Sequence, residues 1–145
     1  MSLPPAGPLL GLDWGAVRTG VAVCDEHRIL ASPLTTITQR RGKRFPVGDL
    51  IALVDQYHPA GVVLGLPVGL DGEDTPSTTA VRELAARLET TLPVPLELWD
   101  ERLTTARALR AIREQGGSTR GRKEDIDSLA ATVLLQHFLD SHRSP

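Results

Sequence analysis

Three acidic positions lie where predicted strands and helices begin or end, in otherwise apolar surroundings. Asp13 falls inside the first apolar strand pattern, the pair Asp100-Glu101 closes the last one, and Asp127 opens the final helical pattern. Carboxylates that fold together repel one another, so such a cluster persists only with a neutralising cation or a shared proton. Mg²⁺ and Mn²⁺ prefer these oxygen ligands, and a pair of such ions can drive phosphodiester hydrolysis. The pattern therefore indicates Asp13, Glu101 and Asp127 as catalytic, metal-binding residues.

Each acid taken alone also has an ordinary structural explanation. Asp127 would interact favourably with the dipole of its helix, and Asp100-Glu101 would be a solvated strand end. The occurrence of all three on one predicted topology favours the catalytic interpretation. Because side chains alternate along a strand, only one of Asp100 and Glu101 can face the metals. We expect Glu101 to be the ligand, with Asp100 as the alternative.

Apolar periodicity places these acids on a mixed sheet. Three short strands with tight connections come first and are expected to pair antiparallel. Helix and strand patterns then alternate, which is typical of parallel strands joined by helices. The expected strands are residues 9–14, 17–24, 28–37, 61–66 and 94–99, and the expected helices are residues 47–57, about 75–92, about 104–115 and about 125–139. The sequence thus predicts an α/β fold with a mixed five-stranded sheet flanked by helices.

Size and composition limit the classes of protein that fit. The 145 residues, 41% of them hydrophobic, suit a single domain spanning 1–145 with one substantial core. The only cysteine, Cys24, excludes an internal disulfide, and its apolar strand surroundings indicate a buried residue. No apolar stretch is long enough to cross a bilayer, and the opening segment has no basic region or cleavage site. We therefore expect a cytoplasmic protein with no membrane association.

Positive charge is concentrated locally in this chain, whose formal net charge is −2. One basic cluster lies at residues 40–44 and a second at residues 110–123, where the Gly-rich segment 115–124 is predicted to be a loop that closes over a nucleic-acid backbone. A solvated surface without a partner is the alternative for both clusters. Arg18 could hold a substrate phosphate or the acids, and the threonines after Glu101 could receive phosphate or cap a helix. The predicted substrate-binding residues are Arg18, Arg102, Thr104, Thr105, Arg120, Arg122 and Lys123.

Four segments, in this order along nearly the whole chain, resemble the YqgF (RuvX) family. They are residues 11–22 (GLDWGAVRTGVA), 65–67 (GLP) with Gly69 and Gly72, 100–105 (DERLTT) and 125–131 (DIDSLAA). The resemblance implies an RNase H-like fold related to the RuvC resolvases. It also implies a nuclease whose three acids, here Asp13, Glu101 and Asp127, bind two Mg²⁺ or Mn²⁺ ions.

The resemblance further implies a role in maturing the 5′ end of precursor 16S rRNA, with a pre-ribosomal particle as a partner. Holliday junction resolution in DNA repair is the alternative, and it would require a homodimer because two strands are cut; otherwise a monomer suffices. Aromatic residues make up only 3% of the chain, so structured or duplex nucleic acid fits better than an unstructured strand.

Two interpretations from other classes compete with a nuclease. Actin-like ATPases also carry an Asp between glycines in their first strand, but they need two lobes, and this chain has the length of one. A non-catalytic RNA-binding or ribosome-binding protein would retain its function after Asp13→Asn, whereas a nuclease would lose metal-dependent cleavage.

Overall fold

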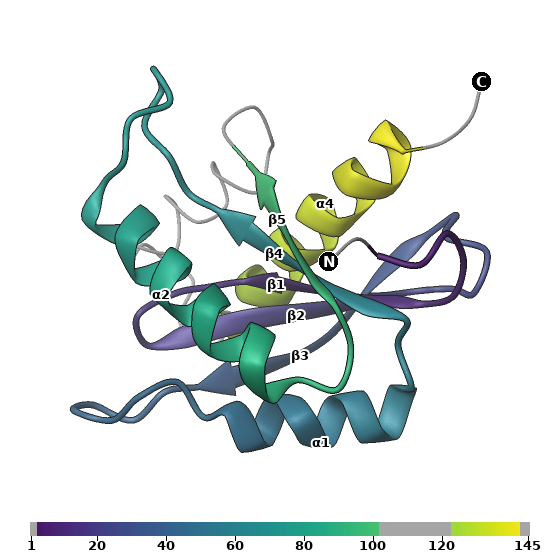
Figure 1. The fold of residues 1–145 in the computed structure, drawn as a ribbon, viewed down its shortest axis with the longest axis horizontal. Coiled ribbons are helices and arrows are strands. Elements are labelled where there is room, and N and C mark those ends of the chain that lie inside the picture. Colours follow the sequence, from purple (N-terminus) through teal and green to yellow (C-terminus); the bar gives the residue numbers. More distant parts are fainter. Residues whose placement is uncertain (1–2, 102–122, 143–145) are drawn as a thin grey trace.

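A five-stranded mixed sheet forms the centre of the molecule (Figure 1). The computed structural model describes residues 3–101 and 123–142. Within these ranges the elements are β1 (Leu9–Asp13), β2 (Arg18–Cys24), β3 (Ala31–Thr38), α1 (Val47–Tyr57), β4 (Gly61–Leu66), α2 (Pro76–Thr91), β5 (Leu96–Asp100) and α4 (Lys123–Ser141). The strands lie in the order β3-β2-β1-β4-β5.

The pairing confirms the predicted sheet. β1 pairs antiparallel with β2, and β2 with β3, whereas β4 lies parallel to both β1 and β5. β1, β4 and β5 therefore all finish at the same end of the sheet, which is also the end at which β2 begins. Binding sites in such sheets form where parallel strands end.

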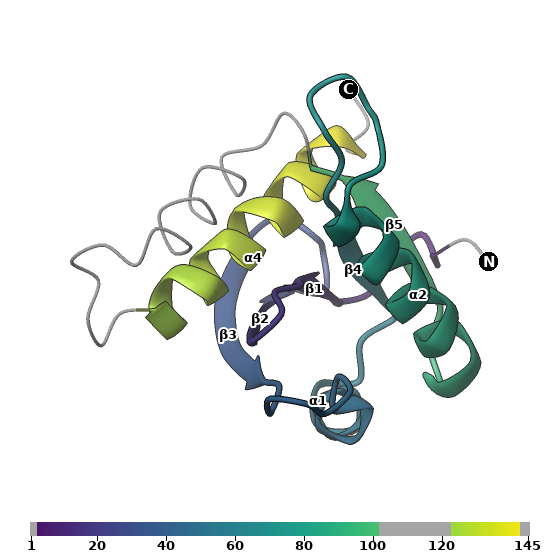
Figure 2. The same cartoon turned by 90° about the vertical axis from the view of Figure 1, so that its left-hand side faces the viewer.

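Helices cover both faces of the sheet, α4 on one and α1 with α2 on the other (Figure 2). Alternation along β1 separates two cores, because Leu10 and Leu12 pack on the side of α1 and α2 while Leu9 packs with Leu135 and Phe138 of α4. Among the described residues, no helix is long and apolar enough to span a membrane.

Small residues allow α4 to lie close against the sheet. A Cβ on Gly11 would stand 2.8 Å from the Cβ of Leu135, and one on Gly20 would overlap the backbone carbonyl of Asp127. On the helix itself, Ala130 and Ala131 are fully buried. The backbone of α4 therefore contacts β1 and β2 at distances that larger side chains would not permit.

The start of α2 is fixed to the end of β4. Thr75 and Thr78 form a capping box, Pro76 occupies the first turn as predicted, and the hydroxyl of Thr78 donates to the carbonyl of Pro67. The loop that leaves the carboxyl end of β4 is thereby tied to the helix that follows it.

Several predicted boundaries are corrected. β3 begins at Ala31 instead of residue 28, because the Asp25 carboxylate accepts hydrogen bonds from the N–H groups of His27, Ile29 and Leu30 and so extends the turn. β5 begins at Leu96 rather than residue 94, and α4 begins at Lys123 rather than residue 125. The predicted helix at 104–115 lies outside the described residues, as does residue range 115–122 of the predicted loop.

Cys24 is buried, as its surroundings predicted. Burial raises the pKa of its thiol above the ordinary value. The residue therefore behaves as a small apolar side chain of the core under α4.

Candidate active site

Asp13 is the last residue of β1 and is fully buried. It lies on the same face as Leu9 and Gly11, which contact α4, because every second residue of a strand shares a face. Its partner in the antiparallel pair is Gly20 of β2. The missing side chain at Gly20 leaves room for the backbone carbonyl of Asp127 in α4.

Glu101 follows β5 directly and is buried, whereas its neighbour Asp100 is exposed. Trp99, two residues before Glu101, packs against α4. Alternation thus directs Glu101 to the face that carries Asp13 and directs Asp100 to the opposite face. On this geometry Glu101 is the better candidate of the two predicted alternatives.

Asp127 lies one turn inside α4, because the helix begins two residues earlier than the sequence predicts. Its Oδ2 accepts a hydrogen bond of 2.9 Å from Nε of Arg18, which forms an ion pair between α4 and the first residue of β2. The Asp127 side chain is fully buried and that of Arg18 is 23% exposed. Helix-dipole stabilisation is strongest in the first turn, so it explains the buried charge at this position less well than the ion pair does.

The backbone of Asp127 and the side chain of Glu101 lie on either side of Asp13. On one side, the Asp127 carbonyl lies over Gly20, the residue that pairs with Asp13. On the other side, the β1–β4 register continued by one residue brings Asp13 beside Gly65, over which Oε2 of Glu101 lies. A Cβ at either glycine would collide with the acid above it.

The chemistry of these residues fits a hard divalent cation, since all three offer carboxylate oxygens at one end of the sheet. In the side-chain placement of this structure, however, no three Asp, Glu, His or Cys residues within the described ranges stand close enough together to hold an ion. Asp127 is turned toward Arg18. A common ligand set would require the three carboxylates to lie closer together than they do here.

The comparison with protein families rests on the same elements. The family model described as "RuvX: Holliday junction resolvase" matches residues 7–141, a range that includes the three acids and the five strands of the described residues. The chain belongs to the RuvX family. A relative from Rhodobacter capsulatus is 43% identical over 139 residues, covering 96% of this chain and 87% of the relative. Another, from Ruegeria pomeroyi, is 41% identical and covers 99% and 92%. Both are named "Putative pre-16S rRNA nuclease".

A solved structure shares the fold of this RuvX chain. RuvC of T. thermophilus, in complex with a Holliday junction substrate, superposes with a TM-score of 0.55 over 92% of this chain and 94% of its own, at 12% sequence identity. The likeness confirms the RNase H-like fold that the sequence predicted. Family and fold together make the RuvX chain a hydrolytic nuclease.

The remaining predicted contacts of this RuvX chain are only partly described. Arg18 forms an ion pair with Asp127, and holding the acids is one of its two predicted roles. Lys123 begins α4, so it is helical and not part of a loop. The other predicted substrate-binding residues lie outside the described ranges: Arg102, Thr104, Thr105, Arg120 and Arg122.

Sequence reasoning missed a cleft on the opposite face of the RuvX sheet. Trp14 lines it together with residues from the segment after β3 and from α2. The position of Trp14, directly after Asp13, was the available signal. The other contributors could not be predicted, because they come from segments that meet only in the folded chain.

Proposed function

We propose that this chain is a divalent-metal-dependent nuclease that matures the 5′ end of precursor 16S rRNA. The supporting observation is the burial of charge: in the described part of the chain, the buried charged residues are Asp13, Glu101 and Asp127. Burying a carboxylate costs several kcal/mol unless other groups compensate it, so structural needs alone would not select three at one place. Ion binding gives each of them a use.

Asp13, Glu101 and Asp127 would hold the Mg²⁺ or Mn²⁺ ions, two by the family resemblance. When bound, the metal would activate water and stabilise the leaving oxygen. The chain supplies rigid placement, because Asp13 and Glu101 lie at the ends of hydrogen-bonded strands. Arg18 keeps the Asp127 carboxylate oriented and offers further N–H groups to a substrate phosphate.

The names of the relatives support precursor 16S rRNA as the substrate. The proposal includes a single domain in the cytoplasm, a pre-ribosomal particle as partner, and a monomer or homodimer. Arg102, Thr104, Thr105, Arg120, Arg122 and Lys123 stay in it as candidate substrate-binding residues. The family description favours a second candidate, the resolution of Holliday junctions.

The neighbours Asp100 and Glu101 provide a matched test. We expect Glu101→Gln to reduce Mn²⁺-dependent cleavage of a 5′-extended 16S precursor by about a hundredfold or more, because several kcal/mol of transition-state stabilisation depend on the metal. Asp100→Asn removes the same charge one residue away on the exposed face, and we expect it to retain cleavage within a few fold. Equal loss in both variants would contradict the assignment of Glu101.

The same assay separates the functional candidates. A four-way DNA junction is offered in parallel, and the oligomeric state is measured by light scattering. Cleavage of the junction by a dimer, with the RNA left intact, would replace the rRNA proposal by the resolvase. RNA binding without cleavage by parent or Asp13→Asn would indicate a binding protein.

A further inference from the structure

A cleft of about 210 Å³ opens between α2 and the segment that joins β3 to α1. It lies on the face of the sheet opposite to the acids, because Trp14 packs with the core of α1 and α2 while Asp13 faces α4. The residues that line it are Trp14, Gln39, Arg44, Phe45, Ala80, Glu83, Leu84 and Arg87.

The cleft lies at the same end of the sheet as the acids. Trp14 follows Asp13 in the chain, and Gln39 follows β3, whose carboxyl end pairs with Arg18 through Thr38. The backbone N–H of Gln39 donates to the carbonyl of Val17 in the β1–β2 turn, over 2.7 Å. The cleft and the acids therefore lie at the same end of the sheet, on its two opposite faces.

Gln39 presents a hydrogen-bond acceptor that lacks a donor among the described residues. Its Nε2 donates to the carbonyl of Lys43 over 2.8 Å, which fixes the orientation of the amide. Its Oε1 is buried and accepts no hydrogen bond from the described part of the chain. An unsatisfied buried acceptor costs about 1–3 kcal/mol, so a ligand N–H or O–H at this position would be favoured.

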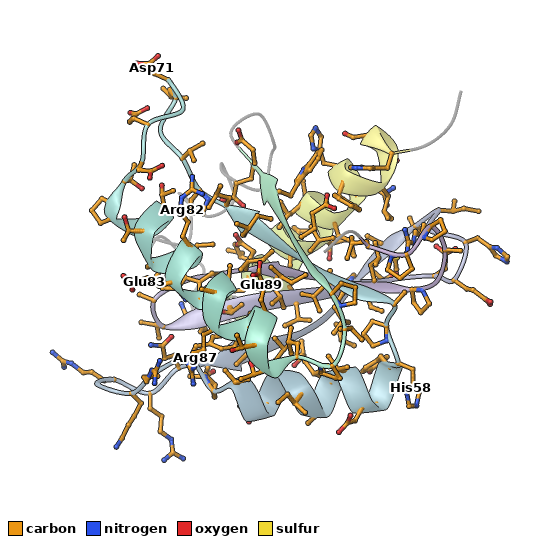
Figure 3. The ribbon with its side chains drawn as sticks, in the orientation of Figure 1. His58, Asp71, Arg82, Glu83, Arg87 and Glu89 are labelled. Atoms are coloured by element: carbon orange, nitrogen blue, oxygen red, sulfur yellow. The ribbon has the colours of Figure 1, made fainter. Side chains whose placement is uncertain are left out.

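Cations and an aromatic ring complete the lining. Arg87 of α2 donates from Nη1 to the carbonyl of Phe45 over 3.1 Å and retains other N–H groups for a ligand. Figure 3 shows Glu83 and Arg87 on the side of α2 that borders the segment after β3. Arg44 is exposed, and Trp14 is half-buried.

This combination suits a nucleotide better than an inorganic anion. An anion would use the arginines but would be repelled by Glu83, whereas a base or ribose can donate to Glu83 and to Gln39. The indole of Trp14 offers a surface for stacking, the usual means of holding an unpaired base. The volume of about 210 Å³ admits a single base, with its ribose and phosphate toward the open side, and excludes a duplex.

We propose that the cleft binds one unpaired ribonucleotide of the substrate close to the scissile phosphate, with its base on Trp14 and its phosphate at Arg44 and Arg87. The inference rests on the proposed RNA nuclease function and adds single-stranded character next to the cut. It revises the sequence-based expectation that structured or duplex nucleic acid fits better than an unstructured strand.

The test measures binding separately from cleavage. Glu101→Gln protein in EDTA is titrated with a short single-stranded RNA and with the duplex of the same sequence, and tryptophan fluorescence is followed. We expect the single strand to quench the fluorescence and the duplex to leave it unchanged. The quench should be lost in the Trp14→Phe background, which keeps an aromatic ring in the core.

Two arginines of the segment between β3 and α1 provide a test variant and its matched control. Arg44 lines the cleft and Arg41 does not, although both are exposed. Arg44→Gln should raise the Kd for the single strand by roughly tenfold or more and raise KM without changing kcat. Arg41→Gln should change Kd by about twofold or less.

Three results would overturn the cleft proposal: equal effects of the two arginine variants, a quench that persists without Trp14, or equal binding of the duplex. These results are independent of catalysis. If the parent protein fails to cleave RNA while the cleft still binds it, the nuclease proposal fails and the binding site stands.

Discussion

Replacing Gly20 by alanine tests how closely α4 lies on the sheet. A Cβ on Gly20 would overlap the carbonyl group of Asp127 and stand 3.0 Å from the amide nitrogen of Ser128. These are backbone atoms, so the clash can be relieved only by moving the helix or the strand. Such overpacking costs about 1–3 kcal/mol, and a shifted helix would also stretch the ion pair between Arg18 and Asp127.

Gly48 provides the matched control. It lies in the first turn of α1, and a Cβ there would meet no atom within 4 Å. Alanine is the better helix former by up to about 1 kcal/mol, so Gly48→Ala should be neutral or slightly stabilising. The two variants should therefore differ by about 1–4 kcal/mol in free energy of unfolding.

Urea denaturation followed by tryptophan fluorescence measures both free energies. We expect Gly20→Ala to unfold at lower urea concentration, with an unchanged slope, and to lose most of its cleavage activity. A Gly20→Ala protein within about 0.5 kcal/mol of the parent, the usual range for a surface substitution, would show that α4 does not contact β2 as described.

Three further substitutions probe the site and the turn before β3. Gly65→Ala would displace the flexible end of Glu101 and press on the buried Leu134, so we expect cleavage to fall about tenfold or more and the urea midpoint to fall as well, by an overpacking cost of about 1–3 kcal/mol. Arg18→Gln leaves the buried Asp127 carboxylate without its ion pair; we expect a loss of about 1–3 kcal/mol, part of which added Mg²⁺ restores, as melting temperatures with and without the ion would show. Backbone N–H groups, of which that of Leu30 has the largest effect, donate hydrogen bonds to the Asp25 carboxylate and lower its pKa from 3.8. The stabilisation that the ionised Asp25 contributes is fully present above pH 3.8 and is lost as the pH falls through the lowered pKa of the folded protein. The difference in urea midpoint between the parent and Asp25→Asn should therefore persist at neutral pH and shrink below pH 3.8.

The central part of the fold could be predicted because its periodicity is unambiguous. The helix at Val47–Tyr57 and the strand at Gly61–Leu66 have the bounds that the apolar pattern indicates. The start of β3 could not be predicted, since the hydrogen bonds that the Asp25 carboxylate accepts from backbone N–H groups determine where the turn ends. Hydrophobic patterns carry no information about such local polar contacts.

The acids could be proposed from the sequence because each stands at or near the boundary of an apolar segment. The choice between Asp100 and Glu101 required knowledge of which strand face meets α4, and the packing of Trp99 supplies it. The contact between Arg18 and Asp127 joins residues far apart in the chain, so no spacing rule could indicate it. The same holds for the cleft beside Trp14.

The three acids differ in what fixes their positions. Asp13 and Glu101 are carried by β1 and by the end of β5, which β4 joins through parallel pairing, so the sheet register sets their spacing. Asp127 is carried by α4, whose distance from the sheet depends on packing against Gly11 and Gly20. An ion shared by all three would therefore link the helix to the sheet. In this structure the guanidinium of Arg18 makes that link, and an ion that took the same oxygen of Asp127 would compete with the ion pair.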